Sequence, residues 1–261
     1  MDTIEHKSTV SRRIKIMDEL AKKGQVNVKE LSKSLGVSEV TIRNDLEQLE
    51  KKNMLVRARG GAMKVTQNFI GVDYPLSDKQ KKNLKEKREI GEKAASLVEN
   101  GDTIILDSGS TTFEVAKHLI DVRDVTIITN ALNIATAMAD KKNINIIVPG
   151  GTLRPNSLSL VGILAEKGFR DYFCDKLFLG VDGFDIDHGV STPNLEEAHL
   201  NQIMLEISKE VIVVTDSSKF KRRGFALISS VDKINTVVTD KGISNQDRDK
   251  LNNMGIKVVI A

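Results

Sequence analysis

Residues 28–52 constrain the fold more than any other part of the chain, because they read as two short amphipathic helices joined by a tight turn at Gly36. In the second helix one stripe is apolar at three- and four-residue spacing, so it has to pack against the first helix. Ser38 stands where it would cap the N-terminus of the second helix. The pattern is that of a helix-turn-helix, which lays its second helix in the major groove of DNA.

The side of the second helix away from its apolar stripe is predicted to face DNA. Its side chains offer hydrogen-bonding and methyl groups to base edges and phosphates. Residues 55–64 then form two short extended stretches around a basic, glycine-containing tip, which is typical of the wing of a winged helix. A further amphipathic helix at 14–24 would close a three-helix core. The candidate DNA-binding residues are Ser38, Val40, Thr41, Arg43, Asn44, Arg57 and Arg59.

The charge distribution separates DNA binding from its alternative, because helix-turn-helix spacing also occurs in helical bundles that never touch DNA. Residues 1–64 hold 14 Lys and Arg against 9 Asp and Glu, a formal charge of +5. Residues 65–261 hold 25 against 27, a formal charge of −2. The positive charge is concentrated where phosphates would have to be neutralised, which favours DNA binding over a merely solvated helical face.

Length and composition indicate a globular protein of two domains. At 261 residues the chain is long for one domain, and 40% of its residues are hydrophobic. No apolar run approaches the roughly 18 residues of a membrane span, and the N-terminus lacks the apolar core of a signal peptide. The single cysteine, Cys174, excludes an intrachain disulfide and a cysteine-based zinc cluster. The four histidines share no ligand spacing, so we expect no metal and no cofactor. The lack of a membrane span, a signal peptide and a disulfide together predicts a cytoplasmic protein.

The domain boundaries follow from a change of pattern after the wing. Residues 65–79 lack sustained periodicity and suit a linker between a DNA-binding domain at 1–64 and a second domain at 80–261. In the second domain, apolar runs without period-two alternation are interleaved with helical patterns, which predicts an α/β fold with an open, largely parallel sheet. The strands are predicted at 103–106, 125–129, 144–148, 176–179, 211–215, 236–238 and 257–260, and the helices between them at about 112–119, 132–139, 160–169, 195–208 and 245–252.

Polar loops after four of these strands predict a ligand site, because ligands of open α/β sheets bind beyond the carboxyl ends of the strands. The loop 107–112 opens directly into a helix, so its hydroxyls and the helix N-terminus suit a phosphate group. The alternative is that its serine and threonines merely cap that helix. The other loops add a Gly-Gly pair with an arginine, two carboxylates and a lysine, and the whole set suits a small phosphorylated polyol. The candidate ligand-binding residues are Asp107, Ser108, Gly109, Ser110, Thr111, Thr112, Gly150, Gly151, Arg154, Asp182, Asp185 and Lys219.

Several of these motifs together resemble one family. The run SRRIKIMDELAKKGQVNVKELSKSLGVSEVTIRNDLEQLEKKNMLVRARGGA looks like the N-terminal domain of DeoR-family bacterial transcriptional regulators. The motifs LDSGSTTFEVAKHL, ITNALNIA, GGTLR, LFLGVDGFD, GVSTPNLEEAHLNQIM and VVTDSSKF resemble the sensor domain of that family. The run GVDGFDIDHGVSTPNLEEAHLNQIM is most like the aga-type branch, which controls N-acetylgalactosamine and galactosamine use. The resemblance implies a homo-oligomeric repressor of a sugar or amino-sugar operon, with operator DNA and a phosphorylated sugar effector as partners.

The sensor domain of that family is similar in fold to ribose-5-phosphate isomerase. This similarity implies that Glu197, together with Asp182 and Asp185, faces the sugar. It also raises an alternative, a sugar-phosphate isomerase or deaminase with an accessory DNA-binding domain. The chain departs from the isomerase pattern, because the acidic D-G-x-D-E run ends here in Ile186 and the glycine-rich stretch near the catalytic glutamate is absent around Glu197. Isomerisation needs a positioned base and a stabilised enediolate, so the sequence favours a regulator with no catalytic residues.

Overall fold

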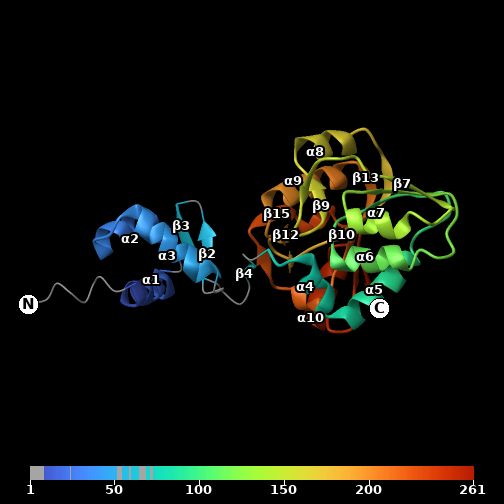
Figure 1. Cartoon of the computed structure of the whole chain (residues 1–261). Coiled ribbons are helices and arrows are strands. Elements are labelled where there is room, and N and C mark those ends of the chain that lie inside the picture. The colour runs from blue at the N-terminus through green and yellow to red at the C-terminus, as the bar shows by residue number, and fades with distance from the viewer. Residues whose placement is uncertain (1–8, 24, 52–54, 59, 65–68, 71–72) are drawn as a thin grey trace, which may run out of the picture. The chain divides into compact units, whose positions relative to one another are not determined.

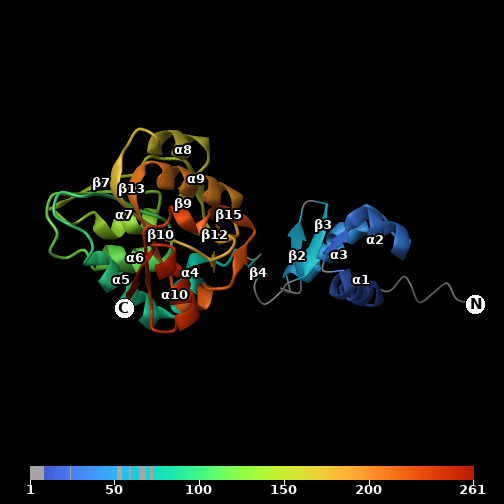
Figure 2. The ribbon, with the colours of Figure 1, turned by 180° about the vertical axis from the view of Figure 1, so that it is seen from behind.

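The computed structural model describes residues 9–23, 25–51, 55–58, 60–64, 69–70 and 73–261 (Figure 1). The chain divides into two compact units, Met1–Val72 and Asp73–Ala261. Figure 2 shows both units from behind. Within the described ranges, no helix has the length and apolar character needed to cross a membrane.

The N-terminal unit is a winged helix-turn-helix, as the sequence predicts. Its helices enclose a small apolar core that includes fully buried Ile16, Leu20 and Ile42. Three short antiparallel strands in the order β1-β3-β2 form the wing sheet. The elements are α1 (Thr9–Lys23), β1 (Gln25–Asn27), α2 (Val28–Leu35), α3 (Glu39–Lys51), β2 (Leu55–Ala58), β3 (Gly61–Lys64) and β4 (Phe69–Ile70). Strand β1 is absent from the sequence-based prediction, because three residues are too few to show an alternating pattern.

The turn between α2 and α3 follows from local chemistry. Gly36 ends α2 in the left-handed conformation, with φ 63°, and its N–H donates to the carbonyl of Ser32. The backbone N–H of Thr41 donates to Ser38 Oγ at 3.1 Å, so Ser38 caps α3 as predicted. These two caps fix where α2 ends and where α3 begins. We call α3, the second helix of the helix-turn-helix, the recognition helix.

A buried ion pair ties the recognition helix to α1. Asp45 of α3 is 2% exposed and pairs with Arg12, and its second oxygen lies 2.9 Å from Arg13 Nε. Replacing Asp45 with alanine would leave Arg12 buried without its partner, so we expect a loss of about 3–5 kcal/mol in the stability of this unit. Native-state hydrogen exchange of the α3 amides measures that loss. Replacing the exposed Asp18 with alanine is the control, and equal protection in both variants would contradict the prediction.

The C-terminal unit is built on a seven-stranded sheet in the order β17-β16-β13-β10-β5-β6-β7, in which every neighbouring pair is parallel. All seven predicted apolar runs form these strands, so the predicted α/β fold is confirmed. The strands are β5 (Thr103–Leu106), β6 (Val125–Thr129), β7 (Ile144–Ile147), β10 (Cys174–Gly180), β13 (Ser208–Val214), β16 (Thr236–Thr239) and β17 (Lys257–Ile260).

Helices cover both faces of this sheet, as continuous apolar runs require. In β5, Ile105 belongs to one buried cluster with helices α8 to α10, while Ile104 and Leu106 belong to a second cluster with α5 to α7. In Figure 1, α8 and α9 lie at the top of this unit, and α5 and α6 lie lower on its right side. The helices are α4 (Leu76–Lys81), α5 (Leu84–Ala95), α6 (Ser110–Lys117), α7 (Leu132–Met138), α8 (Ile163–Phe169), α9 (Leu195–Glu206) and α10 (Asn245–Asn253).

Two parts of the C-terminal unit differ from the prediction. Residues 73–79, expected in the linker, belong to this unit, where Leu76 is buried and begins α4. Short strands also form in segments that were predicted to be loops. One of them, β9, includes residues 160 and 161, so the helix predicted at 160–169 begins only at Ile163. These strands are β8 (Thr152–Arg154), β9 (Ser159–Val161), β11 (Gly183–Asp185), β12 (Gly189–Thr192), β14 (Arg223–Gly224) and β15 (Ala226–Ser229). Two 3-10 turns at Ser217–Lys219 and Val231–Lys233 complete the unit.

Candidate functional site

The exposed side of α3 carries the residues predicted to contact DNA. Arg43 and Asn44 are exposed, Thr41 is half-buried, and Val40 leaves 62% of its surface in solvent. On the opposite side Ile42, Leu46 and Leu49 are buried in the core of the unit. An exposed apolar side chain beside polar ones on a groove-sized helix suits contact with base edges.

Two arginines on this surface have partners within the unit. Arg43 forms an exposed ion pair with Glu39, at 2.6 Å. Arg57, on the wing strand β2, donates from Nη1 to the backbone carbonyl of Arg43 at 3.3 Å. Its backbone N–H donates to Glu50 at 2.8 Å, so the wing is tied to the recognition helix. Arg59, the other predicted wing residue, lies outside the described residues.

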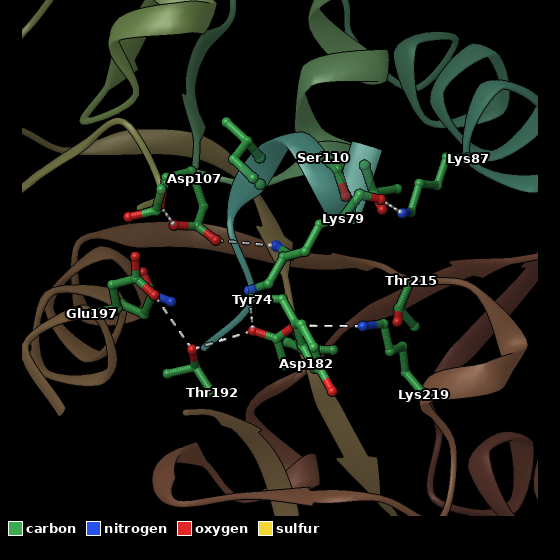
Figure 3. A pocket seen from close by; sticks show the side chains of 18 residues that line it. Tyr74, Lys79, Lys87, Asp107, Ser110, Asp182, Thr192, Glu197, Thr215 and Lys219 are labelled. Atoms are coloured by element: carbon green, nitrogen blue, oxygen red, sulfur yellow. Dashed lines mark hydrogen bonds and ion pairs between the residues drawn. The ribbon is translucent and has the colours of Figure 1, made fainter. Parts of the chain in front are cut away.

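A pocket opens at the carboxyl ends of β5, β10 and β13 in the C-terminal unit (Figure 3). It brings together eight of the predicted ligand-binding residues, from four separate stretches of the chain. They are Asp107, Ser108, Gly109, Ser110, Thr111, Asp182, Glu197 and Lys219. The remaining lining residues were not predicted from the sequence; they are Tyr74, Leu76, Lys79, Lys87, Ser157, Gly180, Val181, Thr192, Asn201 and Thr215.

The N-terminus of α6 forms one wall of this pocket. Strand β5 ends at Leu106, and the helix starts four residues later at Ser110. Gly109 occupies the N-cap position, and no side chain in the described part of the chain caps this end of the helix. Thr112 is fully buried, donates to the carbonyl of Gly109 at 3.1 Å and does not line the pocket. The first-turn N–H groups of α6 therefore remain for an anion, as the phosphate hypothesis requires.

Asp182, two residues past the end of β10, lies between two lysines. Lys79 Nζ is 2.9 Å from one carboxylate oxygen, and Lys219 Nζ is 3.4 Å from the other. Burial alone would raise the pKa of Asp182, but these two ammonium groups lower it below its ordinary value. Asp182 is thus ionised, and the three groups together carry one surplus positive charge.

Asp107 is buried, and among the described residues it forms no ion pair. It is 2% exposed, and the backbone N–H of Gly180 donates to its carboxylate at 3.3 Å. Burial raises the pKa of Asp107 well above its ordinary value, and the nearby charge of Glu197 raises it further. A carboxyl group in this state can donate or accept a hydrogen bond, which suits a hydroxyl of a ligand.

Arg154 is not among the residues that line the pocket, but it pairs with Glu197, which is. Its guanidinium bridges Glu197 and Asp73, and Glu197 also accepts from Ser159 Oγ at 3.2 Å. Thr192 Oγ1 lies 3.4 Å from the second oxygen of Glu197. Arg154 therefore orients a carboxylate that faces the pocket, which is a different position from the direct ligand contact expected of it.

Three further predicted residues lie outside the pocket lining. Gly150 and Gly151 form the turn between β7 and β8 with φ of 93° and 127°, so their role here is conformational. Asp185 is held by Arg223 Nε at 2.7 Å and by His188 Nδ1 at 3.0 Å. Sequence spacing alone did not reveal these partners, and contact of Asp185 with a ligand stays a prediction.

Lys87 of α5 is the least expected residue of the lining. It is 4% exposed, and its ammonium donates to the backbone carbonyls of Lys79 and Lys82. Burial lowers the pKa of Lys87 to about 8. The sequence holds a signal for it, because Lys87 falls on the same helical stripe as the buried Ile90 and Ala94.

The lowered pKa of Lys87 predicts a pH-dependent stability. The unfolded chain has the ordinary pKa of 10.5, so between about pH 8 and 10.5 it binds more protons than the folded protein. The contribution of Lys87 to stability therefore rises with pH in this window. Between pH 7.5 and 9.5 the free energy of unfolding of the wild type should rise by on the order of 1–2 kcal/mol relative to that of a Lys87→Met variant. Urea unfolding followed by circular dichroism measures it, and a constant difference between the two proteins would contradict it.

Known proteins match both units. A model of the DeoR C-terminal sensor domain matches residues 82–241, and a model of the DeoR-like helix-turn-helix domain matches residues 12–68. A transcriptional repressor provisionally assigned to the aga operon of Escherichia coli O157:H7 is 40% identical over 97% of this chain and 94% of its own length. An uncharacterized HTH-type transcriptional regulator of Bacillus subtilis (strain 168) is 37% identical over 95% of each chain. Among solved structures, ribose 5-phosphate isomerase A of Methanocaldococcus jannaschii aligns with a TM-score of 0.40 and 17% identity, over 53% of this chain and 55% of its own.

Proposed function

This chain belongs to the DeoR family of transcriptional regulators, and we propose that it represses a sugar or amino-sugar operon until a phosphorylated sugar binds its C-terminal unit. One observation carries the effector part of this proposal. The pocket combines an uncapped helix N-terminus with lysines beside a buried carboxylate, and this combination suits a phosphorylated polyol. The amino-sugar part rests on the similarity to the repressor assigned to the aga operon.

We propose that different lining residues bind the phosphate and the sugar hydroxyls of the effector. The phosphate lies on Ser108, Gly109, Ser110 and Thr111 at the N-terminus of α6, with the ammonium of Lys219 beside it. The sugar hydroxyls lie on Asp107, Asp182 and Glu197, whose oxygens can accept hydrogen bonds. A charge-assisted hydrogen bond between lysine and phosphate contributes about 1.5–3 kcal/mol, so the phosphate supplies much of the affinity.

The experiment that tests this function measures release from DNA. The pure protein is bound to its operator in a gel-shift assay and titrated with hexose, hexosamine and pentose phosphates and with the matching unphosphorylated sugars. We expect one phosphorylated sugar to release the operator, while its unphosphorylated counterpart has no effect at the same concentration. If none of the phosphorylated compounds changes operator binding, the proposed effector class is wrong.

The enzyme alternative is tested with the same compounds. An isomerase or deaminase would turn over its sugar phosphate, whereas a sensor would bind it and return it unchanged. The carboxylate that faces the sugar in the isomerase interpretation, Glu197, is here held by Arg154, Ser159 and Thr192. We expect no turnover, measured by NMR of the sugar phosphate during incubation with the protein.

We further propose that the protein is a homo-oligomer in the cytoplasm. One helix-turn-helix reads only a few base pairs, and operator specificity usually comes from symmetric half-sites at a fixed spacing. The C-terminal unit leaves large apolar side chains in solvent, with Phe173 at 92%, Leu164 at 70% and Ile163 at 69% exposure. Light scattering at micromolar concentration should show a dimer or larger assembly. A strict monomer that occupies a single half-site would contradict this proposal.

A further inference from the structure

The segment that leads out of the DNA-binding unit forms part of the pocket. We call residues 73–82 the strap; it begins at the boundary between the two units and contains α4. Tyr74, Leu76 and Lys79 of the strap line the pocket. In Figure 3 the side chain of Lys79 points from the strap into the pocket, toward Asp182. The site is therefore incomplete without residues that are directly continuous with the DNA-binding unit.

Polar contacts hold most of the strap in place. At its start, Asp73 pairs with Arg154, and the backbone carbonyl of Asp73 accepts from Asn156 Nδ2 at 2.7 Å. The backbone N–H of Leu76 donates to the carbonyl of Asn156 at 2.8 Å, and the side chain of Leu76 is buried. At the other end, Lys87 donates to two backbone carbonyls of the strap. Such contacts exchange partners more readily than a packed core does.

Three lysines lie in or beside the strap. Lys79 Nζ lies 2.9 Å from Asp182 and 3.8 Å from Asp73, and Lys219 Nζ lies 3.4 Å from the other oxygen of Asp182. The ammonium of Lys87 donates to two backbone carbonyls. Burial lowers the pKa of Lys79, but the charge and hydrogen bond of Asp182, together with the charges of Glu197 and Asp73, raise it above its ordinary value, so Lys79 is a cation at neutral pH. A phosphoryl group brings close to two negative charges and several acceptor oxygens, so it competes well with one carboxylate for such a lysine.

We propose that Lys79 binds the phosphoryl group of the effector, leaving Asp182 for it, and that this exchange fastens the strap to the pocket. The inference rests on the proposed function and deepens it, because it names the part of the chain through which ligand binding reaches the DNA-binding unit. The ammonium of Lys219 has three N–H donors, so it can stay paired with Asp182 while it also meets the phosphate, and the departure of Lys79 does not strand a buried charge. The ligand thus acts on the strap through one side chain.

The test uses the full chain and three probes: inorganic phosphate, galactosamine 6-phosphate and glucose 6-phosphate. Calorimetry should show that Lys79→Ala weakens binding of the best probe at least ten-fold, whereas Lys79→Arg stays within a few-fold of wild type. Lys81→Ala is the matched control, because Lys81 is an exposed lysine of the same strap. Wild-type affinity in Lys79→Ala would overturn the inference while leaving the proposed function intact. Failure of the wild type to bind any probe would overturn both.

Hydrogen exchange of the wild type gives a measurement that does not depend on any variant. Saturation with the best probe should slow the exchange of backbone amides in residues 74–82 at least several-fold. The same probe at saturation should leave these amides unchanged in Lys79→Ala. Unchanged or faster exchange of the strap in the saturated wild type would overturn the inference, even if Lys79→Ala failed to fold.

Discussion

Replacing Lys219 with alanine is expected to weaken effector binding roughly ten- to a hundred-fold and to leave operator affinity without effector unchanged. The variant removes one of the two ammonium groups that flank Asp182, at 3.4 Å from its carboxylate. It also removes the charge proposed to meet the phosphate beside α6, at a cost of about 1.5–3 kcal/mol. The recognition helix belongs to the other unit, so its surface keeps its composition and charge.

Two measurements check this expectation. Calorimetry with the best sugar phosphate gives the change in affinity, and a gel-shift titration gives the concentration that releases the operator. Lys209→Ala is the control, because Lys209 is an exposed lysine on β13, the strand that precedes Lys219. In the cell, the Lys219→Ala variant should repress in the presence of inducer. Release at the wild-type effector concentration would place the phosphate elsewhere and remove the main support for this pocket.

The strands of the sheet were predictable because burial on both faces leaves a local mark in the sequence. Each strand is a short apolar run without alternation, of Leu and Phe in β10 and with Val or Ile in the other six strands. In β5 the neighbours Ile104 and Ile105 enter different clusters. Asp107, Asp182 and Lys219, which follow β5, β10 and β13, were predictable for the same reason. A strand that is located correctly also locates the loop that follows it, and parallel strands bring those loops to one edge.

The rest of the site depends on contacts between segments distant in sequence. Lys79 reaches Asp182 across 103 positions, and nothing in the charged stretch around Lys79 indicates that partner. Asp185 has the same residue type as Asp182, but Arg223 holds it, 38 positions further along the chain. Arg154 was expected to meet a ligand directly, and in the structure its charge is used on Glu197 and Asp73. Charged residues therefore reveal their role only once their partners are known.

Replacing Arg43 and Asn44 together with alanine is expected to abolish operator binding at physiological salt. Both side chains are exposed on the recognition helix, on the side away from the core. A side chain that reads a base contributes about 1–3 kcal/mol, so losing both should cost roughly a hundred-fold or more in affinity. The double variant should lose little folding stability, because the exposed ion pair between Arg43 and Glu39 contributes only about 0.3–0.5 kcal/mol to it. Folding should therefore be preserved while DNA binding is lost.

Single variants show which kind of contact Arg43 makes. If Arg43 reads a base, Arg43→Ala loses affinity for the operator and much less for unrelated DNA. If Arg43 contacts only a phosphate, Arg43→Ala weakens binding to all DNA sequences alike, and the salt dependence of the DNA affinity falls by about one ion. Lys22→Ala, which removes an exposed positive charge from α1, is the control for charge alone. A double variant at Arg43 and Asn44 that binds the operator as wild type does would mean that another surface of the N-terminal unit reads the DNA.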